Sequence, residues 1–228
     1  IFLEDMQRVQ AQAQQIKLAA LGRLTVNIAH EVRNPLSAIS YATELLQEDA
    51  LNAAQQRLLQ IVLDNTQRIN QIVTEVMQLN RRDRAKPEDI ALADFLARLV
   101  EEFNQAEHLD AGVVVLEMHA PLSVQFDRGQ LRQVLWNLLT NGLRHGHCES
   151  GSLLLRCAAS SQQVAVFVED DGAGVPIANQ AKLFEPFFTT AEQGTGLGLY
   201  IAKELCAANG AELLYAPRVT QLGASFGI

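Results

Sequence analysis

The stretch Ala29-His30-Glu31-Val32-Arg33-Asn34-Pro35-Leu36 lies within a helical pattern of apolar residues and decides how the first third of the chain is interpreted. Apolar residues recur there at steps of three and four, the spacing of one buried helix face. His30 falls off that face, about 200° around the helix from Ile28, so its imidazole is expected to meet solvent. The expected buried face comprises Leu24, Ile28, Val32, Pro35, Ile39, Ala42 and Leu46.

An exposed histidine followed by an acid has two interpretations. His30 is a candidate nucleophile with Glu31 as its neighbouring base. Alternatively, both residues belong to a solvated polar face that Pro35 happens to interrupt. This segment alone does not distinguish the two interpretations, so the choice depends on the rest of the chain.

The composition describes a folded, acidic chain. Its 228 residues are 48% hydrophobic and carry a net charge of −8, which suits two modest domains and argues against a general nucleic-acid binder. The three cysteines form no CxxC pair, which favours a reducing, cytoplasmic setting over a disulfide framework or a zinc site. The sequence has no apolar run of about 18 residues, so no membrane-spanning helix is predicted.

Residues 1–86 read as helices. Residues 1–20 show a coiled-coil seam, and a second apolar stripe runs from Leu58 to Leu79 after a polar loop at 47–52. Two amphipathic helices cannot enclose a core alone, so the pattern predicts a homodimeric four-helix bundle. A charged run ending at Pro87 marks the expected domain boundary.

Beyond residue 87 the pattern changes to α+β. Helical spacing predicts three helices, and alternating or continuous apolar runs predict six strands. The helices are expected at 92–103, 130–144 and 197–208, and the strands at 113–118, 122–126, 152–158, 164–169, 212–215 and 224–228.

Two clusters in this second part have the chemistry of a nucleotide site. Asn137 and Asn141 share one helix face and Arg144 lies a turn later, so amide oxygens for a hard cation would adjoin a guanidinium for phosphate. Asp170 ends a buried strand before Gly172 and Gly174, where a carboxylate could accept a bond from an exocyclic amine. Taken singly, a solvated Asn pair and a plain Asp-Gly turn are adequate alternatives.

A third cluster, Gly194-Thr195-Gly196-Leu197-Gly198, opens a helix whose free amides could cradle phosphate. It is neither a Walker sequence nor a dinucleotide fingerprint. The aromatic run from Phe184 to Phe188 precedes it, as core packing or as the hinge of a lid.

Together these motifs resemble the cytoplasmic portion of a two-component sensor histidine kinase. Residues 29–36 are similar to the H box of that family, 137–145 to the N box, 170–174 to the G1 box, 184–188 to the F box and 194–199 to the G2 box. The short segment 189–193 and the phrases at 184–190 and 136–138 resemble the subgroup that contains the nitrogen sensor NtrB and the pilus sensor PilS. The phrases at 141–145 and 198–206 resemble the pilus sensor most.

The resemblance implies a fold, an activity and partners. The fold would be a dimeric helical-hairpin four-helix bundle followed by an α/β-sandwich ATP-binding domain of the gyrase, Hsp90 and histidine kinase type. The chain would divide into a signalling coiled coil (1–20), a dimerisation and phosphotransfer domain (21–86) and a catalytic domain (87–228). The phosphoryl group of ATP would pass to His30 and then to an aspartate of a response regulator, NtrC-like, σ54-linked and controlling type IV pili, and phosphatase activity is expected as well. An upstream sensor would anchor the full-length protein in the inner membrane.

The resemblance also assigns roles to residues. His30 would be the phosphoacceptor, Glu31 its orienting base, and Asn34 the residue that helps water attack the phosphorylated regulator. Asn141 would bind Mg²⁺ and Asp170 would read the adenine amine. The remaining nucleotide-binding positions would be Asn137, Arg144, His145, Gly172, Gly174, Phe184, Gly194, Thr195, Gly196, Leu197 and Gly198. Gly142, Arg144 and His145 depart from the commoner Ala, Lys and aromatic residue.

The main alternative is an ATP-gated, dimerising conformational protein of the gyrase, Hsp90 or MutL type. Such a protein would share the nucleotide domain but would have no need of a helical hairpin that presents His30. A structural coiled-coil dimer with a degenerate nucleotide domain is a further alternative, which failure to bind ATP would favour.

Overall fold

The computed structural model describes residues 32–47, 51–79, 85–160, 163–191, 194–218 and 223–228. The chain divides into two compact units, one containing residues 1–81 and 185–197 and the other residues 82–184 and 198–228. The expected coiled coil at 1–20, together with His30 and Glu31, lies outside the described residues. No helix within the described ranges is long and apolar enough to cross a membrane.

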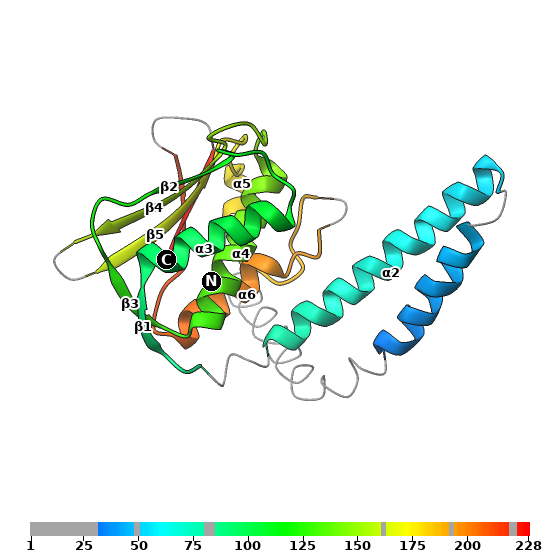
Figure 1. The fold of residues 1–228 in the computed structure, drawn as a ribbon, viewed down its shortest axis with the longest axis horizontal. Coiled ribbons are helices and arrows are strands. Elements are labelled where there is room, and N and C mark those ends of the chain that lie inside the picture. The colour runs from blue at the N-terminus through cyan, green and yellow to red at the C-terminus, as the bar shows by residue number, and fades with distance from the viewer. Residues whose placement is uncertain (1–31, 48–50, 80–84, 161–162, 192–193, 219–222) are drawn as a thin grey trace, which may run out of the picture. The chain divides into compact units, whose positions relative to one another are not determined.

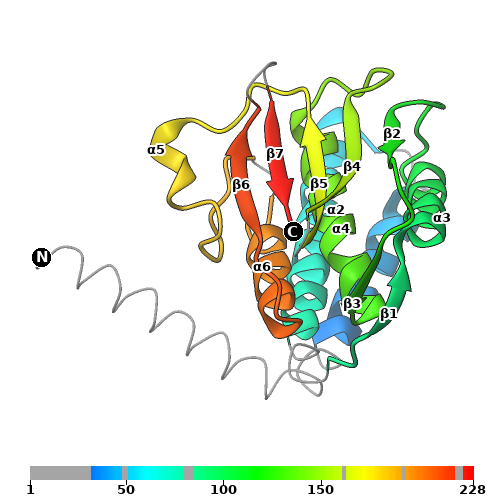
Figure 2. The same cartoon turned by 90° about the vertical axis from the view of Figure 1, so that its left-hand side faces the viewer.

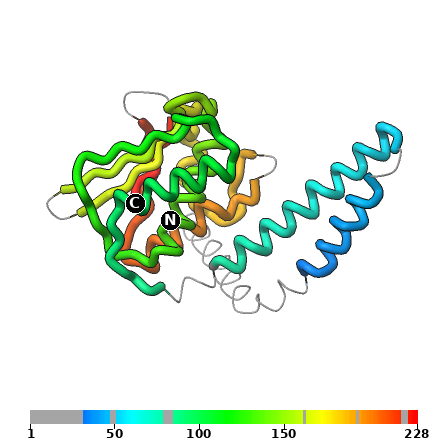
Figure 3. Tube along the Cα trace, viewed as in Figure 1, coloured from blue at the N-terminus to red at the C-terminus, as the bar shows by residue number. Residues whose placement is uncertain are grey.

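The first unit contains the expected helical hairpin (Figures 1 and 3). Its first helix is described over residues 32–47 and its second, α2, spans Ala53–Leu79. Asn52 and Gln55 form a reciprocal capping box at the start of α2, because each side chain accepts the backbone N–H of the other at 2.9–3.0 Å. Between the helices, Arg33 Nη2 donates to Thr74 Oγ1 at 2.9 Å.

The buried face of the first helix differs from the expected one. Pro35, Ile39, Ala42 and Leu46 are all exposed, whereas Leu36 and Thr43 are the buried residues of the described first helix. The reason is that a hairpin of one chain can cover only a narrow seam between its two helices. The apolar stripe itself therefore remains uncovered within one copy of the chain.

The second unit is an α/β sandwich built on a five-stranded sheet with the order β2-β4-β5-β7-β6 (Figure 2). A separate two-stranded sheet pairs β1 with β3, with Ile90 opposite Val124. The elements are β1 Glu88–Ala91, α3 Leu92–Ala106, β2 Val114–Glu117, β3 Ser123–Phe126, α4 Arg128–His145, β4 Leu153–Ala159, β5 Val164–Asp170, α5 Ile177–Gln180, α6 Gly198–Ala208, β6 Leu214–Pro217 and β7 Ala224–Gly227.

Helix α4 supports the core of this unit because it packs against α6 and against β4 and β5. Asp127 caps it, since its side chain accepts the Gln130 N–H at 3.0 Å. The core face is the expected one, and five leucine and valine side chains of α4 are at most 2% exposed: Leu131, Val134, Leu135, Leu138 and Leu139. This layered architecture confirms the expected fold class.

Two elements of the second unit were not expected from the sequence. The residues of β1 follow directly after Pro87 and carry no alternating pattern, and their partner strand lies more than thirty residues along the chain. Helix α5 is a single turn with no buried residue. All three cysteines are free, as expected, with Cys157 and Cys206 buried and Cys148 exposed.

Candidate nucleotide and phosphotransfer sites

Asp170 is the centre of the candidate nucleotide site. It is the last residue of β5 and is only 3% exposed. Its Oδ1 accepts the backbone N–H of Gly172 at 3.0 Å and that of Ala224 at 3.2 Å. Among the described residues no hydrogen bond ends on Oδ2, so this oxygen is the one that remains to accept a bond from a bound base.

Burial raises the pKa of the Asp170 carboxyl above its ordinary value, and the neighbouring Asp171 acts in the same direction. The two backbone N–H bonds and the positive potential of His145 act against that shift. The site therefore holds a desolvated carboxylate, whose hydrogen bonds are stronger than those of a solvated one.

The last turn of α4 lies directly beside Asp170. A Cβ built on Gly142 would come within 3.5 Å of the Asp170 Cβ, and one built on Gly146 within 3.9 Å. A Cβ on Gly172 would overlap the backbone carbonyl oxygen of His145. Glycine at 172 therefore allows the connection after β5 to touch the end of α4.

Gly142, which replaces the commoner alanine, has its own packing reason. A Cβ at this position would lie 2.6 Å from Leu153 Cδ2 in the buried interface between α4 and β4. Leu153 fills the space that an alanine methyl would occupy, so the departure from the family pattern is compensated within the core.

Asn137 joins α4 to the start of α6. Its Nδ2 donates to the Gly198 carbonyl oxygen at 3.0 Å, and its Oδ1 accepts from Gln133 Nε2 at 2.9 Å. The structure thus brings the expected residues Asn137 and Gly198 together. Both ends of the Asn137 amide are engaged inside the protein, so a phosphate contact would require one of these bonds to be exchanged.

Asn141, Arg144 and His145 lie on the last two turns of α4. Asn141 is half-buried, while Arg144 and His145 are exposed. Within the described ranges no group of three or more His, Cys, Asp and Glu side chains is arranged to hold a metal ion.

Gly174 and Phe184 frame the β5 end of the site. Gly174 has a φ of +72°, and a Cβ there would come within 3.1 Å of the Gly223 carbonyl oxygen. Phe184 packs edge-on against the buried Phe226, with ring centroids 6.4 Å apart, and Lys203 Nζ lies 5.1 Å from its ring. Phe184 is thus an aromatic anchor fixed on both sides.

Residues 185–197 form a segment whose glycines are required by close packing. Gly196 has a φ of +69°, and a Cβ on it would overlap the backbone of Phe187. The Phe187 N–H donates to the Gly196 carbonyl oxygen at 2.9 Å, and Leu197 N–H donates to Thr195 Oγ1 at 3.4 Å. A Cβ on Gly194 would overlap Thr189 Oγ1.

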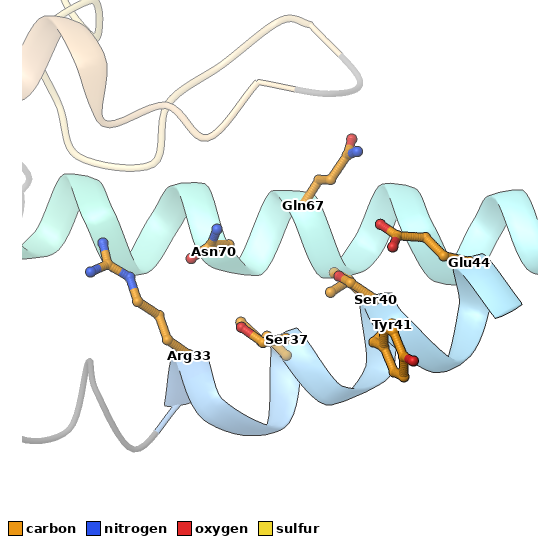
Figure 4. Close-up of a pocket in the computed structure, with 9 residues that line it drawn as sticks. Arg33, Ser37, Ser40, Tyr41, Glu44, Gln67 and Asn70 are labelled. Atoms are coloured by element: carbon orange, nitrogen blue, oxygen red, sulfur yellow. The ribbon is translucent and has the colours of Figure 1, made fainter.

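The expected phosphotransfer residues are only partly described. His30 and Glu31 lie outside the described ranges, whereas Asn34 is exposed on the first helix. A groove of about 230 Å³ follows this helix and α2 (Figure 4). Its labelled lining residues are polar or charged: Arg33, Ser37, Ser40, Tyr41, Glu44, Gln67 and Asn70.

Sequence reasoning missed the residues that hold Asp170 in place. Arg218 Nη1 donates to the Asp170 carbonyl oxygen at 3.1 Å, and the Ala224 N–H reaches its carboxylate. Both come from the end of the chain, more than forty residues beyond Asp170. The positive φ of Gly223 follows from this contact, but only the strand register could have revealed it.

Comparison with known proteins gives two family matches. Residues 20–85 match the His Kinase A (phospho-acceptor) domain, and residues 126–226 match the histidine kinase-, DNA gyrase B- and HSP90-like ATPase family. Two curated relatives are the sensor protein kinase PilS of Pseudomonas aeruginosa, 45% identical over 96% of this chain, and the signal transduction histidine-protein kinase AtoS of Escherichia coli, 33% identical over 93%. The chain spans 42% and 35% of their respective lengths.

The structure resembles that of full-length ShkA solved in complex with AMPPNP. The TM-score is 0.68 at 25% sequence identity, over 90% of this chain and 45% of that one. A phospho-acceptor domain followed by an ATPase domain, in the order that the sequence motifs indicated, is the arrangement of sensor kinases. The chain therefore belongs to the two-component sensor histidine kinase family.

Proposed function

We propose that this chain is the kinase module of a sensor histidine kinase, which moves the γ-phosphoryl group of ATP to His30 and from there to an aspartate of a response regulator. The observation that carries the proposal is the buried Asp170 carboxylate, held by two backbone amides beside the last turn of α4, in a chain that also has a phospho-acceptor domain. A nucleotide site alone would fit many ATPases. The phospho-acceptor domain supplies the group that receives the phosphate.

ATP would bind with its adenine against Gly172, and Asp170 Oδ2 would accept a bond from the exocyclic amine. A guanine presents a carbonyl oxygen at that position, so a carboxylate favours adenine. Gly174 and Phe184 would shape the pocket. Arg144 and Asn137 would approach the phosphates, with His145 at the edge of the site.

A magnesium ion fits the donor set. The half-buried Asn141 provides a neutral oxygen one turn before the end of α4, and the phosphate oxygens of ATP would complete an oxygen-rich shell. The ion would neutralise phosphate charge. The protein would supply position: α4 holds Asn141 and Arg144 on one rigid element, as positioning-dominated phosphoryl transfer requires.

Gly194, Thr195, Gly196, Leu197 and Gly198 would contribute backbone amides to the phosphates. The support for this role is local, since the close backbone approach of Phe187 to Gly196 excludes larger residues. Gly198 begins α6, and the first amides of a helix favour anions.

Residues 21–86 would be the dimerisation and phosphotransfer domain, preceded by a coiled coil and followed by the catalytic domain at 87–228. The support for dimerisation is an uncovered apolar stripe on the described hairpin. Its large members are 42–64% exposed in one copy, namely Ile39, Leu45, Leu46, Leu58, Ile61, Val62 and Ile69. A second copy would bury this stripe in a four-helix bundle.

The regulator would be NtrC-like and σ54-linked, with type IV pili as the controlled system, because PilS is 45% identical to this chain. The full-length protein would carry an upstream sensor anchored in the inner membrane. Phosphotransfer profiling across purified receiver domains tests the first point: transfer that is fastest to a regulator outside the NtrC-like class would contradict it.

Radiolabel transfer tests the kinase assignment. The chain with γ-labelled ATP and Mg²⁺ is expected to acquire an acid-labile label that His30→Gln abolishes, with Asn141→Ala reducing both labelling and Mg²⁺-dependent nucleotide binding. Label that survives His30→Gln would show that another residue is the acceptor. Glu31→Gln is expected to slow labelling without preventing ATP binding, because Glu31 would help keep the attacking nitrogen of His30 unprotonated.

Phosphatase activity toward the regulator would depend on Asn34, which is exposed on the first helix. Asn34→Ala should lose dephosphorylation of the phosphorylated regulator while autophosphorylation continues. Equal dephosphorylation by the variant and the parent chain would remove Asn34 from this role.

A further inference from the structure

Glu169 and Asp170 are neighbours in β5 and therefore point to opposite faces of the sheet. Asp170 faces α4, as its approach to Gly142 shows. Glu169 points to the other face, yet it is only 9% exposed. A carboxylate that is buried on the face opposite the helices requires partners, and these partners lead back to Asp170.

Two arginines and one hydroxyl surround the Glu169 carboxylate. Arg156 Nη2 lies 2.9 Å from Oε1, and Arg218 Nε lies 3.4 Å from Oε2. Ser225 Oγ donates to Oε1 at 3.3 Å. The two arginines differ in exposure: the Arg156 side chain is 36% exposed and stacks on Phe167, whereas that of Arg218 is 15% exposed.

Arg218 also contacts the backbone of the base-reading residue. While its Nε faces Glu169, its Nη1 donates to the Asp170 carbonyl oxygen at 3.1 Å. A planar guanidinium can hold two acceptors in a fixed relation, which a lysine ammonium does not do. In the part of the chain that the structure describes, Arg156 makes no corresponding contact with Asp170; its partners are Glu169 and the ring of Phe167.

The chain around Gly223 is shaped to admit this contact. Gly223 has a φ of +140°, and a Cβ on it would overlap the Asp170 carbonyl oxygen and come within 3.0 Å of Arg218 Cδ. The next residue, Ala224, donates its N–H to Asp170 Oδ1. Arg218, which follows β6, thus holds Asp170 at its carbonyl oxygen, and Ala224, the first residue of β7, holds it at its carboxylate.

We propose that Arg218, oriented by Glu169, is a positioning residue for base recognition: it fixes the Asp170 peptide so that Oδ2 is aimed at the exocyclic amine of adenine. The inference rests on the proposed adenine-reading role of Asp170. Arg218 touches no nucleotide itself. It determines the direction of the carboxylate and therefore the preference for ATP over GTP.

The test compares ATP and GTP affinities of the whole chain by titration calorimetry, with thermal unfolding of each variant alongside. Arg218→Met keeps the side-chain length but removes both polar contacts. It is expected to weaken ATP binding by about tenfold, the effect of one lost hydrogen bond, while GTP binding changes little. The KM for ATP should rise equally, with kcat for autophosphorylation retained.

Arg156→Met is the matched control, since it removes the other cation on the same carboxylate without touching Asp170. It should lower the unfolding temperature as Arg218→Met does but leave the ratio of ATP to GTP affinity unchanged. Arg218→Lys should restore the unfolding temperature but not the ratio. If Arg156→Met and Arg218→Met change the ratio equally, or Arg218→Met lowers both affinities in parallel, the ion pair is only structural and the proposal is wrong.

Asp170→Asn separates this proposal from the one on which it rests. If Asp170→Asn abolishes the preference for ATP while Arg218→Met leaves it intact, Asp170 recognises the base but Arg218 does not position it. If Asp170→Asn itself leaves the preference intact, adenine is read elsewhere and both proposals fall. Glu169→Gln, which keeps an oxygen for Arg218 but removes the charge, should give an intermediate loss of the ratio.

Discussion

The two units of this chain differ in how much of their apolar surface they bury within one copy. The α/β unit buries its own large side chains, with Leu135, Leu138 and Phe103 fully enclosed. The hairpin leaves Leu58, Val62 and a stripe of similar residues open to solvent, although its sequence is equally periodic. A sheet with helices on one face closes a core within one copy, whereas two helices do not. Mutations in the hairpin should therefore change the dissociation constant of the dimer, whereas mutations in the α/β unit should change the free energy of unfolding.

The largest effect is expected at the uncovered stripe. Val62→Asp combined with Ile69→Asp should dissociate the dimer, because each buried apolar side chain contributes about 1.5–3 kcal/mol and the change occurs in both copies. The dissociation constant, measured by sedimentation equilibrium, should rise by at least about a hundredfold. Gln56→Asp, exposed on the same helix, is the control. An unchanged dissociation constant for the double variant would place the dimer contact elsewhere.

In the α/β unit the corresponding change should affect stability and not association. Leu138 is fully buried in α4, so Leu138→Ala is expected to cost about 2–5 kcal/mol of unfolding free energy, measured by denaturant titration. Leu214→Ala, at a side chain that is 56% exposed, should stay within about 0.5 kcal/mol. Similar losses of unfolding free energy in the two variants would mean that α4 packing does not stabilise the core.

Two glycines of the site provide a finer comparison. Gly172→Ala would drive a methyl group into the His145 carbonyl oxygen, which is backbone, so a loss of about 1–3 kcal/mol in ATP binding free energy is expected by calorimetry. Gly142→Ala meets the end of the Leu153 side chain, which can rotate. Gly142→Ala should therefore weaken ATP binding less than Gly172→Ala does. A larger loss in Gly142→Ala would show that the contact between Gly172 and His145 does not shape the site.

The smallest effect concerns pH. Burial alone would raise the pKa of Asp127, but hydrogen bonds from the backbone N–H groups of Lys86, Gln130 and Gly129 hold it below its ordinary value of 3.8. Because the folded pKa is the lower one, the stabilisation is present above pH 3.8 and is lost as the pH falls through the folded value. Asp127→Asn keeps the cap, so this variant should lose only the part of the acid destabilisation that Asp127 contributes, with a change of at most about 1 kcal/mol at neutral pH. Parallel acid-unfolding curves for the variant and the parent would contradict this.

The sequence pattern predicted the three long helices of the α/β unit and six of its seven described strands, and it missed β1 and the single-turn helix α5. The core face of α4 was expected residue by residue, and its observed start differs by two positions because Asp127 caps it. Strand β1 was missed, since four residues after a proline carry no pattern and their pairing with β3 is a tertiary event. The stripe of the first helix was expected to need a second copy to cover it, and Ile39 and Leu46 are indeed exposed in one copy.

The candidate site divides in the same way. Asp170, Gly172 and Asn141 were predicted as site residues because motifs place them near an end of a strand or helix. Arg218 and Gly223 were not found, because their contact with Asp170 depends on the register of β7 against β5, with Glu169 opposite Ser225. Sequence therefore predicts the groups that would meet the nucleotide more readily than the groups that hold them.

The bond between Asn137 and the Gly198 carbonyl oxygen has a consequence for how the protein can diversify. This bond holds Gly198, the residue at which α6 begins. The contact between Phe184 and Phe226 holds the other end of the segment 185–197. The connection between these points closes a loop whose ends are already held, and doubling the length of such a loop costs only about 0.6 kcal/mol. Length changes between residues 185 and 197 should therefore leave the sheet intact.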